Sequence, residues 1–144
     1  MRFLAPALVS LFIAACGGGD DSVSAPNGPA RGSYTVTLRS GEPSLITQEA
    51  LTLQLTDVHD SRCPIDALCI WEGHASVAVQ VVQAGHAGET LQIGLPAPAE
   101  MKLPGEATYR GFRFSLQGLD PAPRAAVPVP LAQYRAVVRV ERAE

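Results

Sequence analysis

The sequence predicts an all-β fold: an antiparallel two-sheet sandwich of the immunoglobulin-like type, with a small β-barrel as the alternative. Apolar and polar residues alternate in six separate runs, which is the side-chain period of a β-strand. Clusters of glycine and proline separate these runs, as expected for turns and connections. No apolar stripe of helical period and useful length occurs. Without an N-terminal segment of about 32 residues that lacks the pattern of a strand, about 110 residues form the folded domain, which is the size of an immunoglobulin-like domain.

Six alternating runs are expected as strands: residues 34–39, 51–56, 75–82, 90–95, 110–116 and 134–141. The second run places three leucines on one face, and the third and fourth flank a turn at 84–88, which predicts a β-hairpin. The fifth run brings two phenylalanines and a leucine together. The sixth places alanine and valines opposite mostly charged side chains. Such one-sided apolar faces predict two sheets packed face to face.

The N-terminal segment is typical of an export signal. Residues 3–15 form an apolar stretch behind Arg2, and this stretch is shorter than the about 20 residues that a membrane-spanning helix needs. It ends in Ile13-Ala-Ala-Cys16, which resembles the lipobox of bacterial lipoproteins. The resemblance implies cleavage before Cys16, a diacylglyceryl group on its thiol and acylation of its amine. Two or three acyl chains hold a protein durably to a bilayer.

Three segments follow from this interpretation: a signal peptide at 1–15, a disordered tether at 16–32 and a β-sandwich domain at 33–144. The tether is rich in Gly, Ser, Pro, Ala and Asp and has no apolar periodicity. Gly17 differs from the aspartate that favours inner-membrane retention in enteric bacteria, so the expected location is the outer membrane, facing the periplasm or the cell surface. The expected membrane contact is the lipid anchor at Cys16.

The charge balance argues against nucleic acid as a partner. The formal net charge is −3, and removal of the single charge of Arg2 with the signal peptide takes it to −4. No cluster of lysine and arginine offsets this acidic balance.

The stretch DSRCPIDALCIWEG, residues 60–73, connects two predicted strands as a crossover or a wide hairpin loop. Cys63 and Cys69 are too close in sequence to bridge two sheets, so the hallmark of true immunoglobulin domains is absent. Once Cys16 is lipidated, these are the two remaining cysteines of an exported chain, which predicts a disulfide between them. Closing this ring contributes about 2 kcal/mol. The pinned loop is expected to lay its apolar residues across the open end of the core: Ile65, Leu68, Ile70 and Trp71.

Three other roles for this loop remain open. His59, Cys63, Cys69 and His74 offer two nitrogens and two sulfurs, a set that suits tetrahedral zinc or Cu(I). A redox-active thiol is a further alternative, with Arg62 beside Cys63, although the spacing is C-x5-C and not C-x-x-C. Partner recognition would use Arg62 and Trp71 as anchors.

No catalytic residue and no cofactor are assigned. The sequence lacks the G-x-S-x-G elbow, H-E-x-x-H, the Walker motif and the dinucleotide fingerprint. Asp57 and Asp60 form the best pair of carboxylates for glycosidase-like chemistry. Acids in such a loop are more often solvated or bonded to an arginine such as Arg62, so these two are interpreted as structural.

Asp60-Ser-Arg-Cys-Pro, followed by Cys69-Ile-Trp-x-Gly73, resembles a motif of a group of small exported bacterial lipoproteins or hypothetical proteins. Similar features extend over most of residues 34–141, although only the cysteine loop is specific. Many of those relatives have alanine where this chain has Glu72. The group has no established activity, so the resemblance supports the domain boundaries and the disulfide and implies no reaction.

The leading hypothesis is a lipid-anchored cell-envelope sandwich that acts by binding or structural support and is not an enzyme. Its partner would be an envelope protein or a glycan, met through loops. The first alternative is a zinc- or copper-handling module at the cysteine loop. The second is a small envelope hydrolase or redox enzyme.

Overall fold

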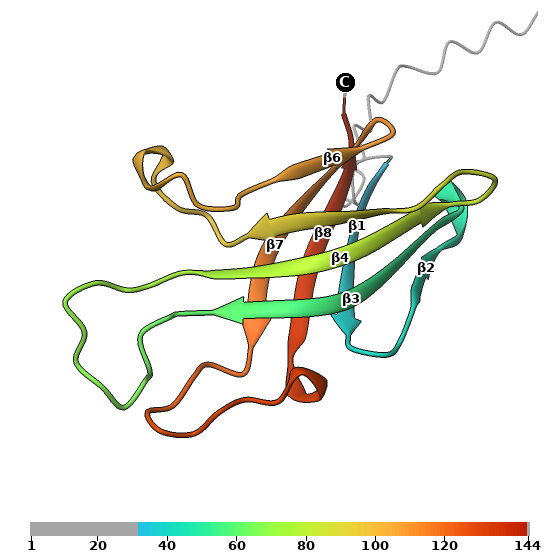
Figure 1. Cartoon of the computed structure of the whole chain (residues 1–144). Coiled ribbons are helices and arrows are strands. Elements are labelled where there is room, and N and C mark those ends of the chain that lie inside the picture. Colours follow the sequence, from blue (N-terminus) through green and yellow to red (C-terminus); the bar gives the residue numbers. More distant parts are fainter. Residues whose placement is uncertain (1–31, 144) are drawn as a thin grey trace, which may run out of the picture.

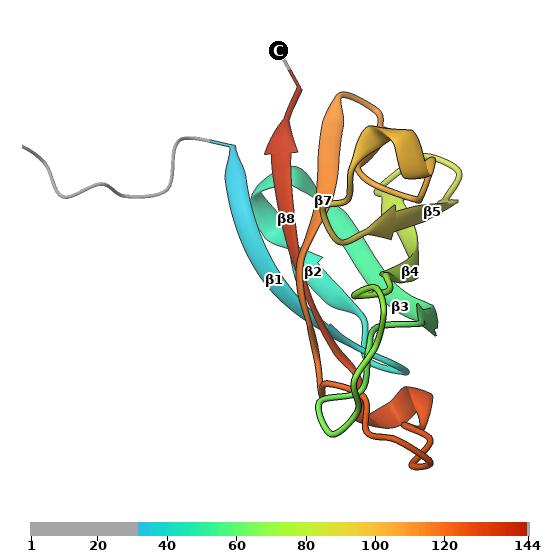
Figure 2. The same cartoon turned by 90° about the vertical axis from the view of Figure 1, so that its left-hand side faces the viewer.

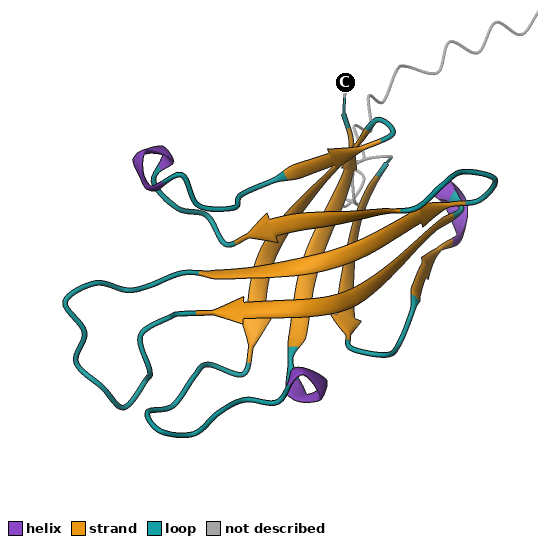
Figure 3. Ribbon diagram, in the orientation of Figure 1, coloured by secondary structure: helices purple, strands orange, loops and turns teal. Residues whose placement is uncertain are grey.

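In the computed structural model, which describes residues 32–143, eight β-strands form two antiparallel sheets of four strands each (Figure 1). The strands are β1 (Ser33–Arg39), β2 (Ser44–Ile46), β3 (Leu51–Asp60), β4 (Ala75–Gln83), β5 (Glu89–Gly94), β6 (Ala107–Tyr109), β7 (Phe112–Asp120) and β8 (Arg135–Arg142). Three single-turn 3₁₀ helices lie in the connections, as Figure 3 shows: η1 (Thr47–Glu49), η2 (Ala99–Met101) and η3 (Leu131–Gln133).

One sheet is built from consecutive strands, whereas the other brings the first strand beside the last. One sheet has the order β2-β3-β4-β5, and the other has the order β1-β8-β7-β6, in which β1 pairs with β8 from Ser33 opposite Glu141 to Arg39 opposite Arg135. Figure 2 shows the sheets as two layers, and in Figure 1 their strands cross steeply. The predicted two-sheet antiparallel sandwich is confirmed, and the described strands do not close into a barrel.

The core lies between the layers and uses the inward-facing residues that the alternation predicts. In β3, Leu51, Leu53 and Leu55 face inward and are fully buried. The other layer contributes every second residue of β7 and β8, and Phe114 is the largest side chain that is completely buried. Burial of these apolar side chains supplies the main force that holds the two sheets together.

Two strands run further than the sequence predicts, and a β-bulge explains each case. The register of β3 shifts between Leu55 and Asp57, and that of β7 shifts between Leu116 and Gly118. A bulge inserts one extra residue, so the period-two pattern breaks although pairing continues. Both strands therefore continue beyond the bulge and end at Asp60 and Asp120.

The sequence does not predict β2 and β6, which have three residues each. Three residues are too few for a periodic signal, and both strands lie at sheet edges close to proline-containing connections. The hairpin around residues 84–88 is confirmed, because β4 and β5 are antiparallel neighbours.

The predictions for the signal peptide at 1–15, for lipidation of Cys16 and for nearly all of the tether fall outside the described residues. Within residues 32–143, no helix is long and apolar enough to cross a membrane.

Candidate functional site

The cysteine loop, residues 61–73, connects β3 to β4 and is a wide hairpin loop. The ladder of the two strands continues into it, because the Ser61 amide donates to the His74 carbonyl (2.8 Å) and the Cys63 amide donates to that of Glu72 (2.7 Å). A disulfide between Cys63 and Cys69 closes the tip, with the two Cα atoms 5.9 Å apart. The predicted disulfide is therefore confirmed.

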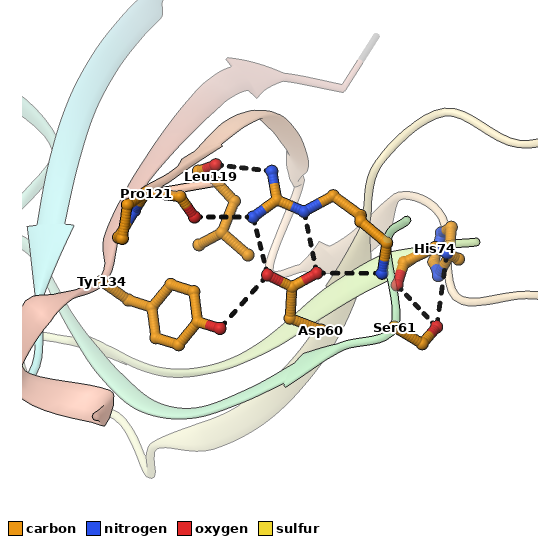
Figure 4. Close-up of polar contacts among 7 residues, drawn as sticks. Asp60, Ser61, His74, Leu119, Pro121 and Tyr134 are labelled. Carbon is orange, nitrogen blue, oxygen red and sulfur yellow. Dashed lines mark hydrogen bonds and ion pairs between the residues drawn. The ribbon is translucent and has the colours of Figure 1, made fainter. Parts of the chain in front are cut away.

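A polar network ties the base of the cysteine loop to the opposite sheet (Figure 4). The Arg62 guanidinium donates to Asp60 Oδ1 (2.8 Å) and Oδ2 (2.7 Å), and it also donates to the backbone carbonyls of Leu119 (2.7 Å) and Pro121 (3.0 Å). The Tyr134 hydroxyl donates to Asp60 Oδ2 (3.2 Å). Asp60 ends β3, whereas Leu119 and Tyr134 belong to the β7 and β8 side, so the network links the two layers.

The environment of Asp60 keeps its carboxyl group ionised. Burial alone raises the pKa of Asp60, but hydrogen bonds from the Arg62 side chain and backbone, the guanidinium charge and the Tyr134 hydroxyl outweigh it and lower the pKa below its usual value. The hydrogen bonds that the Arg62 side chain donates to the Asp60 carboxylate in turn raise the pKa of Arg62. Burial, followed by the charge of Asp60, raises the pKa of Tyr134. The positive charge of Arg62 is therefore compensated by Asp60 within the domain.

Gly73 is required by the close approach of the two sides of the loop. Its φ is +73°, and a Cβ atom there would lie 1.9 Å from the Ser61 carbonyl oxygen. The Ser61 hydroxyl donates to the His74 carbonyl (2.8 Å), and the His74 amide donates back to that hydroxyl (3.3 Å). Only glycine fits this conformation and this distance.

A second loop supports the cysteine loop from the side. The Ile65 amide donates to the Pro123 carbonyl (3.0 Å), and the Ala125 amide donates to Asp66 Oδ1 (2.8 Å). Residues 121–134 connect β7 to β8, so segments about 60 residues apart in sequence hold each other in place. The cysteine loop is thus fixed by its ladder, its disulfide and its neighbour.

The expectation that the loop covers the open end of the core is wrong. The side chains that were expected to bury are largely exposed, at 61% for Ile65, 105% for Leu68, 107% for Ile70 and 63% for Trp71. The end of the sandwich is closed by other residues, among them Tyr134 and Leu119, which are 7% and 4% exposed. The loop therefore displays its apolar residues to solvent instead of burying them.

A groove of about 520 Å³ lies beside the loop. Trp71, Glu72 and His74 form one side, and the connection after β5 forms the other with residues 95–98 and Met101. His74 is buried and its Nε2 lies 3.0 Å from the Leu95 carbonyl oxygen, which joins the two sides at the floor. Met101 is 45% exposed and, like Trp71, presents apolar surface at the rim.

The four residues of the proposed metal set do not form a site. Cys63 and Cys69 are bonded to each other, so neither sulfur is a thiolate ligand. His59 is exposed on β3, whereas His74 is buried and bonded to Leu95. Among residues 32–143, no group of three or more His, Cys, Asp or Glu side chains is placed to hold a metal ion. The disulfide also removes the free thiol that the redox alternative requires.

The two carboxylates considered for catalysis have other contacts. Asp57 Oδ1 accepts the amide of the next residue, Val58 (2.8 Å), and Asp60 is held by Arg62 and Tyr134. Of the two predicted anchors for a partner, Arg62 is enclosed in the polar network, whereas Trp71 is exposed.

Sequence reasoning missed Tyr134 and the far side of the groove, residues 95–101. The alternating pattern places Tyr134 only at the start of the last strand, and nothing in the neighbouring sequence signals that its hydroxyl reaches Asp60. The run Pro96-Ala-Pro98 has the composition of a connection and carries no signal of a binding surface. No protein-family model, curated protein or solved structure matches this chain.

Proposed function

We propose that the protein is a lipid-anchored module of the bacterial cell envelope that acts by binding and not by catalysis, with the cysteine loop as its contact surface. The observation that carries the proposal is the exposure of four large apolar side chains on one rigid loop: Ile65, Leu68, Ile70 and Trp71. Contiguous exposed apolar side chains mark interaction sites in folded proteins.

The rigidity of the loop supports binding over a passive staple. If the disulfide only stabilised the fold, exposed isoleucine and leucine side chains beside it would be a disadvantage, because exposed apolar surface favours aggregation. Here the disulfide, the ladder to His74 and the bond to Pro123 hold this surface in one conformation. A preorganised surface loses less conformational entropy on binding, which increases affinity.

The proposal is tested by site-specific cross-linking in the cell. A photoreactive amino acid replaces Ile70 in the full chain, and a matched variant carries it at Ala87, an exposed position in the hairpin between β4 and β5. We expect one discrete cross-linked envelope species from position 70 and none from position 87. Equal cross-linking at both positions, or none at either, would contradict the proposal. Trp71→Ala in the position-70 variant should reduce the yield severalfold.

A further inference from the structure

We infer that the groove beside Trp71 receives a basic side chain, arginine or lysine, presented by a protein partner. The inference rests on the proposed function and names the chemistry of the ligand. Three properties of the groove lead to it: its walls, its charge and the surface that surrounds it.

The walls suit a long aliphatic stem. Trp71 lies on one side, and Leu95, Pro96, Pro98 and Met101 lie on the other. Arginine and lysine pack their methylene groups along such apolar surface while the charged end stays hydrated or paired. The indole ring of Trp71 is also the aromatic group that attracts a cation most strongly.

The charge of the groove favours a cation. Three ionisable residues line it: Arg62, Glu72 and His74. The guanidinium of Arg62 is paired with Asp60, and His74 is buried with its Nε2 beside the Leu95 carbonyl. Glu72 is exposed and has no ion-pair partner among residues 32–143. The groove thus offers one uncompensated negative charge beside an indole ring.

The surface around the groove indicates a protein partner. Leu68 and Ile70 are fully exposed next to Trp71, and the desolvated centre of a protein interface is where such aliphatic side chains lie. Asp66 and Glu72 are acidic, and the charge of Arg62 is offset by Asp60, so the loop repels rather than attracts the phosphates of an anionic membrane. A protein partner with an apolar surface and a central basic residue would complement both the exposed aliphatic side chains of the loop and the acidic charge of the groove.

The only tryptophan of the whole chain is Trp71, so its fluorescence reports the groove directly. The purified full chain is titrated with the pentapeptide acetyl-Ala-Leu-Arg-Leu-Ala-amide and with the same peptide containing citrulline, which has the shape of arginine without its charge. We expect the emission of Trp71 to change with peptide concentration for both peptides. The initial slope for the arginine peptide should be about two- to fivefold steeper than for the citrulline peptide, which is the contribution of one exposed ion pair.

Glu72→Gln should remove the preference for arginine over citrulline. Glu100→Gln is the matched control, because Glu100 is an exposed acid next to Met101 that does not line the groove, and it should leave the preference unchanged. Circular dichroism shows that each variant is folded.

Equal slopes for the two peptides, or a preference that survives Glu72→Gln, would overturn the inference. So would a blue shift of Trp71 with vesicles of phosphatidylethanolamine and phosphatidylglycerol, or a response to chitotriose, without a response to the arginine peptide. In each of these cases specific cross-linking at position 70 would leave the proposed function standing. Loss of that cross-linking together with a retained arginine preference would remove the proposed function and leave the groove chemistry intact.

Discussion

Two clusters of the same composition, each a tyrosine, a carboxylate and an arginine, join the sheets at opposite ends of the sandwich. At the end of the cysteine loop the members are Tyr134, Asp60 and Arg62. At the other end, Glu49 accepts from the Tyr34 hydroxyl (2.9 Å) and is paired with Arg142. The Arg142 hydrogen bonds lower the pKa of Glu49 even though it is buried. A charged pair of this kind is costly to break on one side only.

Asp60→Asn tests the first cluster through pH. Because the folded pKa of Asp60 is lowered, its contribution to stability is present above the unfolded pKa of about 3.9 and is lost as the pH falls through the folded value. We expect the variant to lose about 2 kcal/mol at pH 7, and the difference from the original protein to narrow below about pH 4. Urea unfolding at several pH values measures this. Asp57→Asn, at an exposed position, is the control and should change the free energy of unfolding by less than about 0.5 kcal/mol at pH 7.

Gly73→Ala tests the close approach within the loop. The added Cβ meets the Ser61 carbonyl, and the φ of +73° adds strain, so we expect a loss of about 3 kcal/mol in thermal or urea unfolding. Gly85 has a similar φ of +79°, but a Cβ there meets no heavy atom within 4 Å. Gly85→Ala should therefore cost only the backbone strain, about 1 kcal/mol. Equal losses for the two variants would show that the approach to Ser61 is not tight.

At the scale of elements, alternation predicted the strands only as far as their bulges. Leu51, Leu53 and Leu55 could be placed on one face from the sequence, but the extra residue before Asp57 ends the pattern.

The exposure of Trp71 could not be predicted either. A large apolar residue such as tryptophan close to a disulfide is expected to be buried. Only the contacts of Arg62 and Tyr134 across the sheets show that this end of the sandwich is already closed.

The disulfide should contribute to stability without supporting the core. Replacing both Cys63 and Cys69 by serine opens a ring of seven residues, for which the chain-entropy model gives about 2 kcal/mol. We expect at most this loss in urea unfolding, with the sandwich intact, because the large apolar side chains of the loop are exposed and do not belong to the core. The yield of cross-linking from position 70 should fall severalfold in this double variant, even though the sandwich remains folded. A variant that fails to fold would show that the loop supports the core after all.

At the scale of the whole molecule, the chain enters the sandwich far from the candidate site. Ser33 pairs with Glu141 at one end of its sheet, whereas the cysteine loop is bonded to the 121–134 connection at the other end (Figure 2). Residues 17–32 span at most about 55 Å between Cys16 and β1. With the lipid anchor proposed at Cys16, the chain would approach the sandwich from the end opposite to the cysteine loop.

Cys16→Ser tests the anchor. In the original protein we expect a mature N-terminus at Cys16 and an added mass of two or three acyl chains, found in the membrane fraction. The variant should lack the lipid mass and leave the membrane fraction, because the anchoring arises from buried acyl methylenes at about 0.8 kcal/mol each. Mass spectrometry and cell fractionation measure the two effects. A variant that stays with the membrane would point to a different attachment.

The pairing of β1 with β8 joins the first and last strands of the domain. Because β1 has no other full partner strand, its sheet stays incomplete until residues 135–142 are available. Contacts so distant along the chain slow folding, since the entropy of closing a long loop must be lost before they form. If the chain is exported unfolded, as the proposed signal peptide implies, the pairing of β1 with β8 can form only after residues 135–142 have crossed the membrane.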